Sequence, residues 1–98
     1  MELDDEVCLC FHVSKRKLLN FARIEKPRRV GQMSECFGAG TGCGWCRPML
    51  ERYFKVAVEQ GHTEVDEPGR EQYARQRAQY LREGKGTPPP GATPPPEE

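Results

Sequence analysis

The chain has 98 residues and equal numbers of acidic and basic side chains, so its formal net charge is zero. This length favours one small domain. No apolar run approaches the ~20 residues that span a bilayer, and the acidic start MELDDEVCLC lacks the apolar segment of a signal peptide. We therefore expect no membrane partner and a cytoplasmic location, where structural disulfides are rare.

The first predicted elements are a short extended segment and a helix. Residues 7–11, VCLCF, mix apolar residues with cysteines and contain no helix breaker. Residues 12–26 are predicted to be mainly helical, with Ser14 as the N-cap, because its hydroxyl can accept a hydrogen bond from a first-turn amide. The residues expected to form one buried stripe are Leu18, Phe21 and Ala22, and Pro27 ends the helix.

Two further helices are predicted on either side of a glycine-rich loop. Residues 28–37 favour a short helix, with Val30, Met33 and Phe37 on one face and Cys36 beside them. Residues 46–61 favour a third helix, because Pro48 suits a first turn and Gly61 suits a C-terminal cap. The apolar side of this third helix is expected to comprise Met49, Leu50, Tyr53, Phe54 and Ala57.

The remaining residues are predicted to add little to the core. A fourth helix is expected over residues 69–84, but its apolar stripe is thin. Residues 84–98 hold six of the nine prolines and no large apolar side chain, which predicts a disordered tail. We therefore divide the chain into a domain over residues 1–62, a linker with a short helix over residues 63–83, and a tail over residues 84–98.

Four of the five cysteines form two motifs. Cys8 and Cys10 make C-x-C, and Cys43 and Cys46 make C-x-x-C. Side chains two apart on an extended segment point the same way, as do side chains three apart in a helical turn, so each motif can offer two sulfurs to one metal atom. A core of fewer than ~70 residues usually needs such a staple.

The loop before the third helix predicts the charge of the bound group. Glycines occupy every second position from Gly38 to Gly44. Glycine lets backbone amides approach closely, and the N-terminus of the following helix favours an anion. A cluster with four thiolates and bridging sulfides is anionic, and nearby N–H groups stabilise it. A zinc ion with four cysteine ligands is the alternative.

These motifs resemble a known family. C-x-C near the N-terminus, a Ser-capped helix and GAGTGCGWCRPML are similar to the bacterioferritin-associated ferredoxin-like (BFD-like) 2Fe–2S binding domain. The resemblance covers about residues 7–59. The family includes small proteins and domains of larger redox enzymes such as assimilatory nitrite reductases. It implies an all-α fold of three to four short helices, helix-turn-helix-like, around a 2Fe–2S cluster. It also implies Cys8, Cys10, Cys43 and Cys46 as the cofactor-binding and metal ligands.

Several other residues have two interpretations each. Cys36 is expected to be a buried apolar side chain rather than a ligand. His12 is expected to pack at the helix entry or to donate a hydrogen bond near the cluster. Arg47 can offset the charge of the cluster or face solvent. Trp45 departs from the family, which often has a small or basic residue there, and can shield the cluster or dock a partner.

The resemblance implies a non-enzymatic electron carrier in iron homeostasis. Its expected partners are redox proteins, a bacterioferritin that releases iron on reduction and a reductase. Residues 11–34 carry seven cations against Glu25 alone, which favours an anionic partner. The alternative is a zinc-stapled helical module that binds nucleic acid or protein. The acidic flanks and neutral total charge make nucleic acid the weaker candidate.

Overall fold

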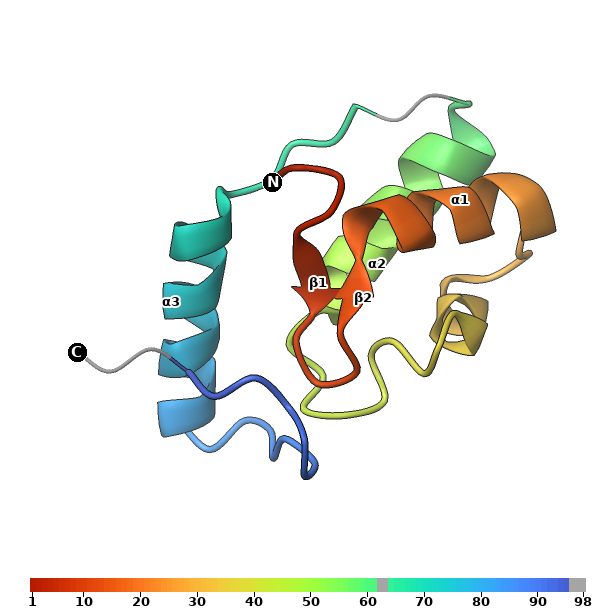
Figure 1. Ribbon diagram of the computed structural model, residues 1–98. Coiled ribbons are helices and arrows are strands. Elements are labelled where there is room, and N and C mark those ends of the chain that lie inside the picture. Colours follow the sequence, from red (N-terminus) through yellow and green to blue (C-terminus); the bar gives the residue numbers. More distant parts are fainter. Residues whose placement is uncertain (62–63, 96–98) are drawn as a thin grey trace.

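The computed structural model describes residues 1–61 and 64–95, and its first element is a small hairpin (Figure 1). Strand β1 (Glu6–Cys8) pairs antiparallel with strand β2 (Val13–Ser14). The extended conformation predicted for residues 7–11 is confirmed only at residues 7 and 8. It is wrong for residues 9–11, which lie in the turn (residues 9–12) that joins the two strands. The hairpin was not predicted, because a two-residue strand leaves no alternating pattern in the sequence.

The first helix follows the hairpin directly. Helix α1 (Lys15–Glu25) has Ser14 as its N-cap, whose hydroxyl accepts a hydrogen bond from the Lys17 amide at 3.2 Å. Its buried residues are Leu18, Leu19 and Ala22. Lys26 takes a left-handed conformation (φ 46°) that ends the helix immediately before Pro27, so the predicted start and stop of this helix are both confirmed.

The second predicted helix is a tighter 3₁₀ helix, η1 (Val30–Glu35). Met33 on it is fully buried, but Phe37 is 67% exposed, so the prediction that Phe37 shares a buried face is wrong. The reason is that η1 ends at Glu35 and Phe37 has a positive φ of 55°, which turns the chain away from the helix axis.

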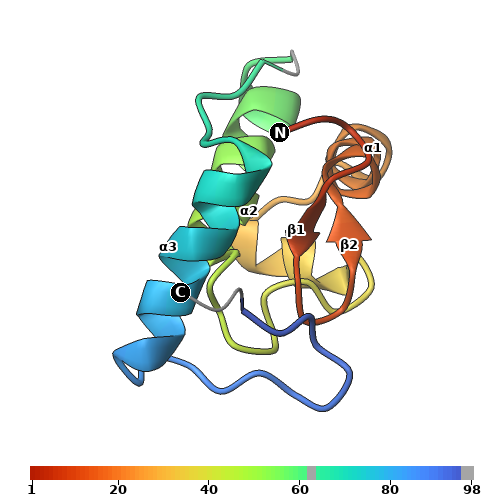
Figure 2. The same cartoon turned by 60° about the vertical axis from the view of Figure 1, so that its left-hand side comes forward.

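The third predicted helix is present in two parts. Helix α2 (Arg47–Phe54) has Pro48 in its first turn and continues as a π-helical segment, η2 (Lys55–Glu59). Four of the five predicted apolar residues are buried: Met49, Leu50, Tyr53 and Phe54. The fourth predicted helix is confirmed as α3 (Arg70–Arg82), which lies beside the hairpin in two views (Figures 1 and 2). Within the described ranges, no helix has the length and apolar character needed to cross a bilayer.

The last described segment runs back across the molecule. Residues 84–95 form no helix or strand, but they lie against the hairpin (Figure 2). The Thr93 amide donates to the Leu9 carbonyl at 2.8 Å, and the Gly91 carbonyl accepts a hydrogen bond from His12 at 2.8 Å. The predicted domain boundary at residues 62 and 63, and the last three residues of the predicted tail, lie outside the described residues.

The fold is therefore helical, as predicted, with one added hairpin and one shared core. Buried residues from β1, β2, α1, η1 and α2 join Tyr73 of α3 in a single apolar cluster. All five cysteines belong to the same cluster. Helix α3 is thus packed into the same core as the domain predicted over residues 1–62.

Candidate metal centre

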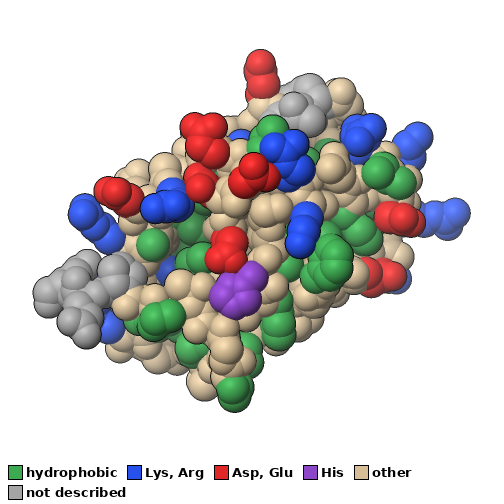
Figure 3. Space-filling model, viewed as in Figure 1, with side chains coloured by type: hydrophobic (Ala, Val, Ile, Leu, Met, Phe, Trp, Pro, Cys, Tyr) green, Lys and Arg blue, Asp and Glu red, His purple; other side chains and the backbone are tan. Residues whose placement is uncertain are grey.

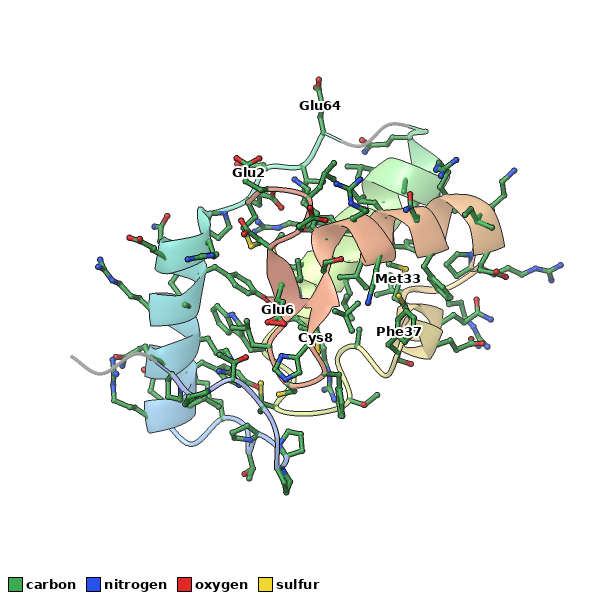
Figure 4. The ribbon with its side chains drawn as sticks, viewed as in Figure 1. Glu2, Glu6, Cys8, Met33, Phe37 and Glu64 are labelled. Carbon is green, nitrogen blue, oxygen red and sulfur yellow. The ribbon has the colours of Figure 1, made fainter. Side chains whose placement is uncertain are left out.

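The fold brings the two cysteine motifs together. Cys8 ends strand β1, and Cys10 lies in the hairpin turn. Cys43 lies in the glycine-rich loop, and Cys46 is the N-cap of α2. All four side chains are buried, with exposed fractions between 2% and 7%. Figure 4 shows Cys8 and the neighbouring sulfur atoms at the turn of the hairpin, between α3 and the glycine-rich loop.

The thiols contact one another across the motifs. Cys8 exchanges a side-chain hydrogen bond with Cys46, and Cys10 does so with Cys43. Among residues 1–61 and 64–95, no three His, Cys, Asp or Glu side chains are grouped as the ligands of a single ion. The interactions join the motifs in two pairs, Cys8 with Cys46 and Cys10 with Cys43. The two ends of the 32-residue segment between the motifs therefore lie close together.

Backbone amides surround the sulfur atoms. The Cys43 amide donates to the Cys10 sulfur at 3.3 Å. The pKa of Cys8 is lowered to about 5, mainly by the hydrogen bond from the Cys46 thiol. Burial opposes this shift, and the amides of Gly40, Phe11 and Cys10 add to it. A thiolate at neutral pH is the form that binds a metal ion. The hydrogen bond to Cys8, followed by burial, raises the pKa of Cys46, which is therefore the donor of that pair.

The glycine-rich loop passes close to the sulfur atoms because its glycines carry no side chains. A Cβ atom on Gly42 would lie 2.8 Å from the Cys10 sulfur, which is closer than any side chain tolerates. Gly40 has a φ of +83°, and its amide lies near the sulfurs of both Cys8 and Cys46. The predicted use of bare backbone at this loop is therefore confirmed, for close approach at Gly42 and for a left-handed conformation at Gly40.

Three other predicted residues lie near the sulfur atoms but contact different groups. Cys36 is buried, and its thiol donates to the Lys17 carbonyl at 3.7 Å, in agreement with its predicted place in the core. Arg47 donates to the Gly40 carbonyl at 2.9 Å, so it braces the loop rather than contacting a sulfur. His12 is exposed between Glu6 and the Gly91 carbonyl (Figure 3), so its prediction as a packed residue is wrong.

Trp45, between Cys43 and Cys46 in sequence, packs against α3. Its ring lies 5.6 Å from that of Tyr73 and 5.3 Å from that of Tyr80, between ring centroids. The Tyr80 hydroxyl donates to the Cys43 carbonyl at 2.6 Å, and the Tyr73 hydroxyl donates to the Val7 carbonyl at 2.7 Å. Trp45 remains partly exposed, so both of its predicted roles, shielding the cluster and docking a partner, stay predictions.

The sequence did not lead us to predict Arg77 as a site residue, although it is the most deeply buried charged residue near the sulfur atoms. Its side chain is 1% exposed, and its terminal nitrogens donate to the Thr93 carbonyl at 2.8 Å and to the Cys10 sulfur at 3.7 Å. A signal was present, since Arg77 lies four residues after Tyr73 and one before Ala78, on the apolar stripe of α3. A cation inside an apolar stripe indicates a buried anionic partner.

The residues present fit an anionic, thiolate-bound metal group. Four buried cysteine sulfurs are soft ligands of the kind that zinc and iron–sulfur clusters use. The inward-facing amides and the nearby guanidinium stabilise negative charge, which an iron–sulfur cluster carries in its bridging sulfides as well as in its ligands. The donor set and its polar surroundings together favour the cluster over a single ion.

Two curated proteins are similar to this chain over most of its length. The nitrite reductase (NAD(P)H) of Neurospora crassa is 32% identical over 62 residues, which is 63% of this chain and 5% of that protein. The nitrite reductase (NAD(P)H) of Emericella nidulans is 30% identical over 63 residues, which is 61% of this chain and 6% of that protein. The chain thus spans about a twentieth of these relatives. No solved structure matches it at a comparable level of significance.

A family model settles which domain these relatives share with the chain. The BFD-like 2Fe–2S binding domain matches residues 6–56, which is more than half of the chain and contains both cysteine motifs. The match ends before α3, so that helix and the segment after it lie outside the matched region. The cofactor of this domain is a 2Fe–2S cluster, and the chain belongs to the BFD-like 2Fe–2S binding domain family.

Proposed function

We propose that this chain is a one-electron carrier whose 2Fe–2S cluster is bound by Cys8, Cys10, Cys43 and Cys46. The observation that supports this most directly is the meeting of the two cysteine motifs in a buried site lined by backbone amides. The bound cluster supplies reversible one-electron chemistry. The protein's contribution is to hold, bury and tune the cluster, so we propose a carrier rather than an enzyme.

We further propose that the carrier delivers electrons to an acidic protein surface, such as that of a bacterioferritin, from a reductase. Exposed cations follow α1 and the turn after it (Figure 3): Lys17, Arg23, Lys26, Arg28 and Arg29. Exposed apolar side chains, Ile24 and Phe37, lie in the same part of the chain. An apolar centre among cations is suited to brief electrostatic docking of the kind that electron carriers use.

A second acceptor is suggested by the relatives, which are nitrite reductases. Their similarity to this chain is confined to a small part of each enzyme. The domain could therefore serve a larger reductase of that kind as a separate carrier. Zinc binding, with a role in contacting nucleic acid or protein, is the alternative that the cluster assay below excludes or supports.

The first experiment identifies the bound group. The full chain is purified without oxygen, its visible spectrum is recorded, and iron, acid-labile sulfide and zinc are measured. We expect a brown protein with two iron and two sulfide per chain. A colourless protein with one zinc would support the alternative.

Single substitutions then test the ligand set. We expect Cys43→Ala to lose most of the bound iron and to unfold at lower urea concentration, because the bound group is also the staple of the core. Cys36→Ala is the matched control, since Cys36 is similarly buried and its thiol donates to the Lys17 carbonyl. A Cys43→Ala protein with the iron content of the wild type would remove Cys43 from the proposed ligands.

A kinetic experiment tests the docking surface. Reduced carrier is mixed with iron-loaded bacterioferritin, and released ferrous iron is followed with a chelator while salt rises from about 0.05 to about 0.5 M. We expect release to slow with salt, and to slow similarly in Arg28→Glu at low salt. Arg75→Glu, an exposed change on α3, is the control. Rates independent of salt and of Arg28 would contradict docking at this surface.

A further inference from the structure

The part of the chain beyond the matched family domain forms one wall of the cysteine site. Helix α3 and residues 84–95 both contact the cysteine loops. A Cβ atom on Gly86 would lie 2.1 Å from the Cys43 carbonyl oxygen, so the backbone at Gly86 rests directly on that loop. On the other side, the Thr93 amide bonds to the Leu9 carbonyl, between Cys8 and Cys10. The site is therefore enclosed by residues that the family domain does not include.

Within this wall, Arg77 is the residue directed at the cysteine sulfurs. The Thr93 carbonyl holds one terminal nitrogen at 2.8 Å, and the other terminal nitrogen lies 3.7 Å from the Cys10 sulfur. The Nε atom is buried and has no hydrogen-bond partner among the described residues. One backbone carbonyl and one sulfur thus account for the polar contacts of a side chain that is 1% exposed.

A buried guanidinium needs a negative partner. Arginine stays protonated in proteins, and burying an unpaired charge costs several kcal/mol. The ion pairs found among residues 1–61 and 64–95 include none with Arg77. Of the two groups that Arg77 contacts, the Thr93 carbonyl and the Cys10 sulfur, only the sulfur can carry a full negative charge. Two ferric ions, two sulfides and four thiolates leave two excess negative charges at the cysteine site, and one-electron reduction adds a third.

We propose that Arg77 is a positioning residue that raises the reduction potential of the cluster, by donating to the Cys10 sulfur and offsetting charge that increases on reduction. This rests on the proposed function, because it requires Cys10 as a cluster ligand. The electron comes from the reductant and the positive charge stays on Arg77, so no proton is transferred. The C-terminal part of the chain thus sets the potential of a cluster that the family domain binds.

The test is a redox titration of the anaerobically loaded full chain, followed by visible absorbance. Arg77→Met keeps most of the apolar stem and removes the charge and the donor. We expect it to lower the ratio of reduced to oxidised cluster about tenfold at a fixed potential, equivalent to about 59 mV for a one-electron couple. Arg75→Met is the matched control, because Arg75 is exposed on the same helix, and we expect it to titrate like the wild type.

A spectroscopic readout separates this role from a structural one. Loss of the hydrogen bond to the Cys10 sulfur should change the iron–sulfur stretching bands in the resonance Raman spectrum of Arg77→Met, and leave those of Arg75→Met unchanged. An Arg77→Met protein with full iron and sulfide content, the wild-type potential and the wild-type bands would overturn the proposal. It would leave the cluster assignment intact, which fails only if the wild type holds no cluster.

Arg77→Lys keeps the proposal testable if Arg77→Met does not fold. Lysine retains the charge but lacks the planar fork that reaches Thr93 and Cys10 together. We expect a shift of the potential in the same direction as for Arg77→Met, but smaller. A loaded Arg77→Lys protein with the wild-type potential and bands would show that neither the contact nor its geometry matters.

Discussion

At the scale of single residues, position 42 in the cysteine loop has no room for a side chain. A Cβ atom there would lie 2.7 Å from the Cβ atom of Cys10 and 3.1 Å from the Cδ atom of Pro89. The φ of Gly42 is not in the left-handed region, so the requirement is for space alone. Both neighbours are held in place: Cys10 lies in the hairpin turn, and Pro89 belongs to residues 84–95, which lie against the hairpin.

We expect Gly42→Ala to displace the Cys10 sulfur. Overpacking of this kind costs about 1–3 kcal/mol in the free energy of unfolding, and iron content should fall in parallel. Urea denaturation and an iron assay measure the two effects. Gly31→Ala is the control, because nothing lies within 4 Å of an added Cβ atom there. Equal iron content in both variants would contradict the close packing at Gly42.

At the scale of elements, the sequence predicts what local chemistry determines. Ser14 and Pro27 bound α1, Pro48 begins α2, and the glycine loop separates the cysteine motifs, because caps and turns act within a few residues. The position of α3 could not be predicted in this way. It depends on hydrogen bonds and ring contacts to residues more than twenty-five positions earlier, and its apolar stripe is thin.

The contact between α3 and the hairpin is testable through one hydroxyl. Tyr73 is 2% exposed and donates to the Val7 carbonyl, so Tyr73→Phe leaves that buried acceptor unpaired while keeping the ring beside Trp45. We expect a loss of about 1–3 kcal/mol in the free energy of unfolding, measured with urea. Gln72→Ala, an exposed change on the same helix, should cost far less. Equal stability of the two variants would mean that this hydrogen bond does not secure α3.

At the scale of the whole molecule, Glu67 joins segments that are far apart in sequence. Its carboxylate, 6% exposed, accepts hydrogen bonds from the terminal amino group of Met1 at 3.1 Å, from Tyr53 of α2 at 2.6 Å, and from Lys15 of α1. Burial raises the pKa of Glu67, but these three donors outweigh burial and lower the pKa below its ordinary value. The chain at Glu67, shortly before α3, is thereby fixed to the domain.

We expect Glu67→Gln to destabilise the protein by about 2 kcal/mol at pH 7, because Lys15 keeps a charge that loses its partner in a largely buried site. A carboxyl group with a lowered folded-state pKa stabilises the fold above its unfolded-state pKa, and this stabilisation is lost as the pH falls through the folded-state value. Urea denaturation should therefore give the same difference between variant and wild type at pH 7 and pH 6, with narrowing only below the ordinary Glu pKa of 4.5. Asp66→Asn, its exposed neighbour, is the control, and a Glu67→Gln protein as stable as that control at pH 7 would show that the three donors do not need the charge.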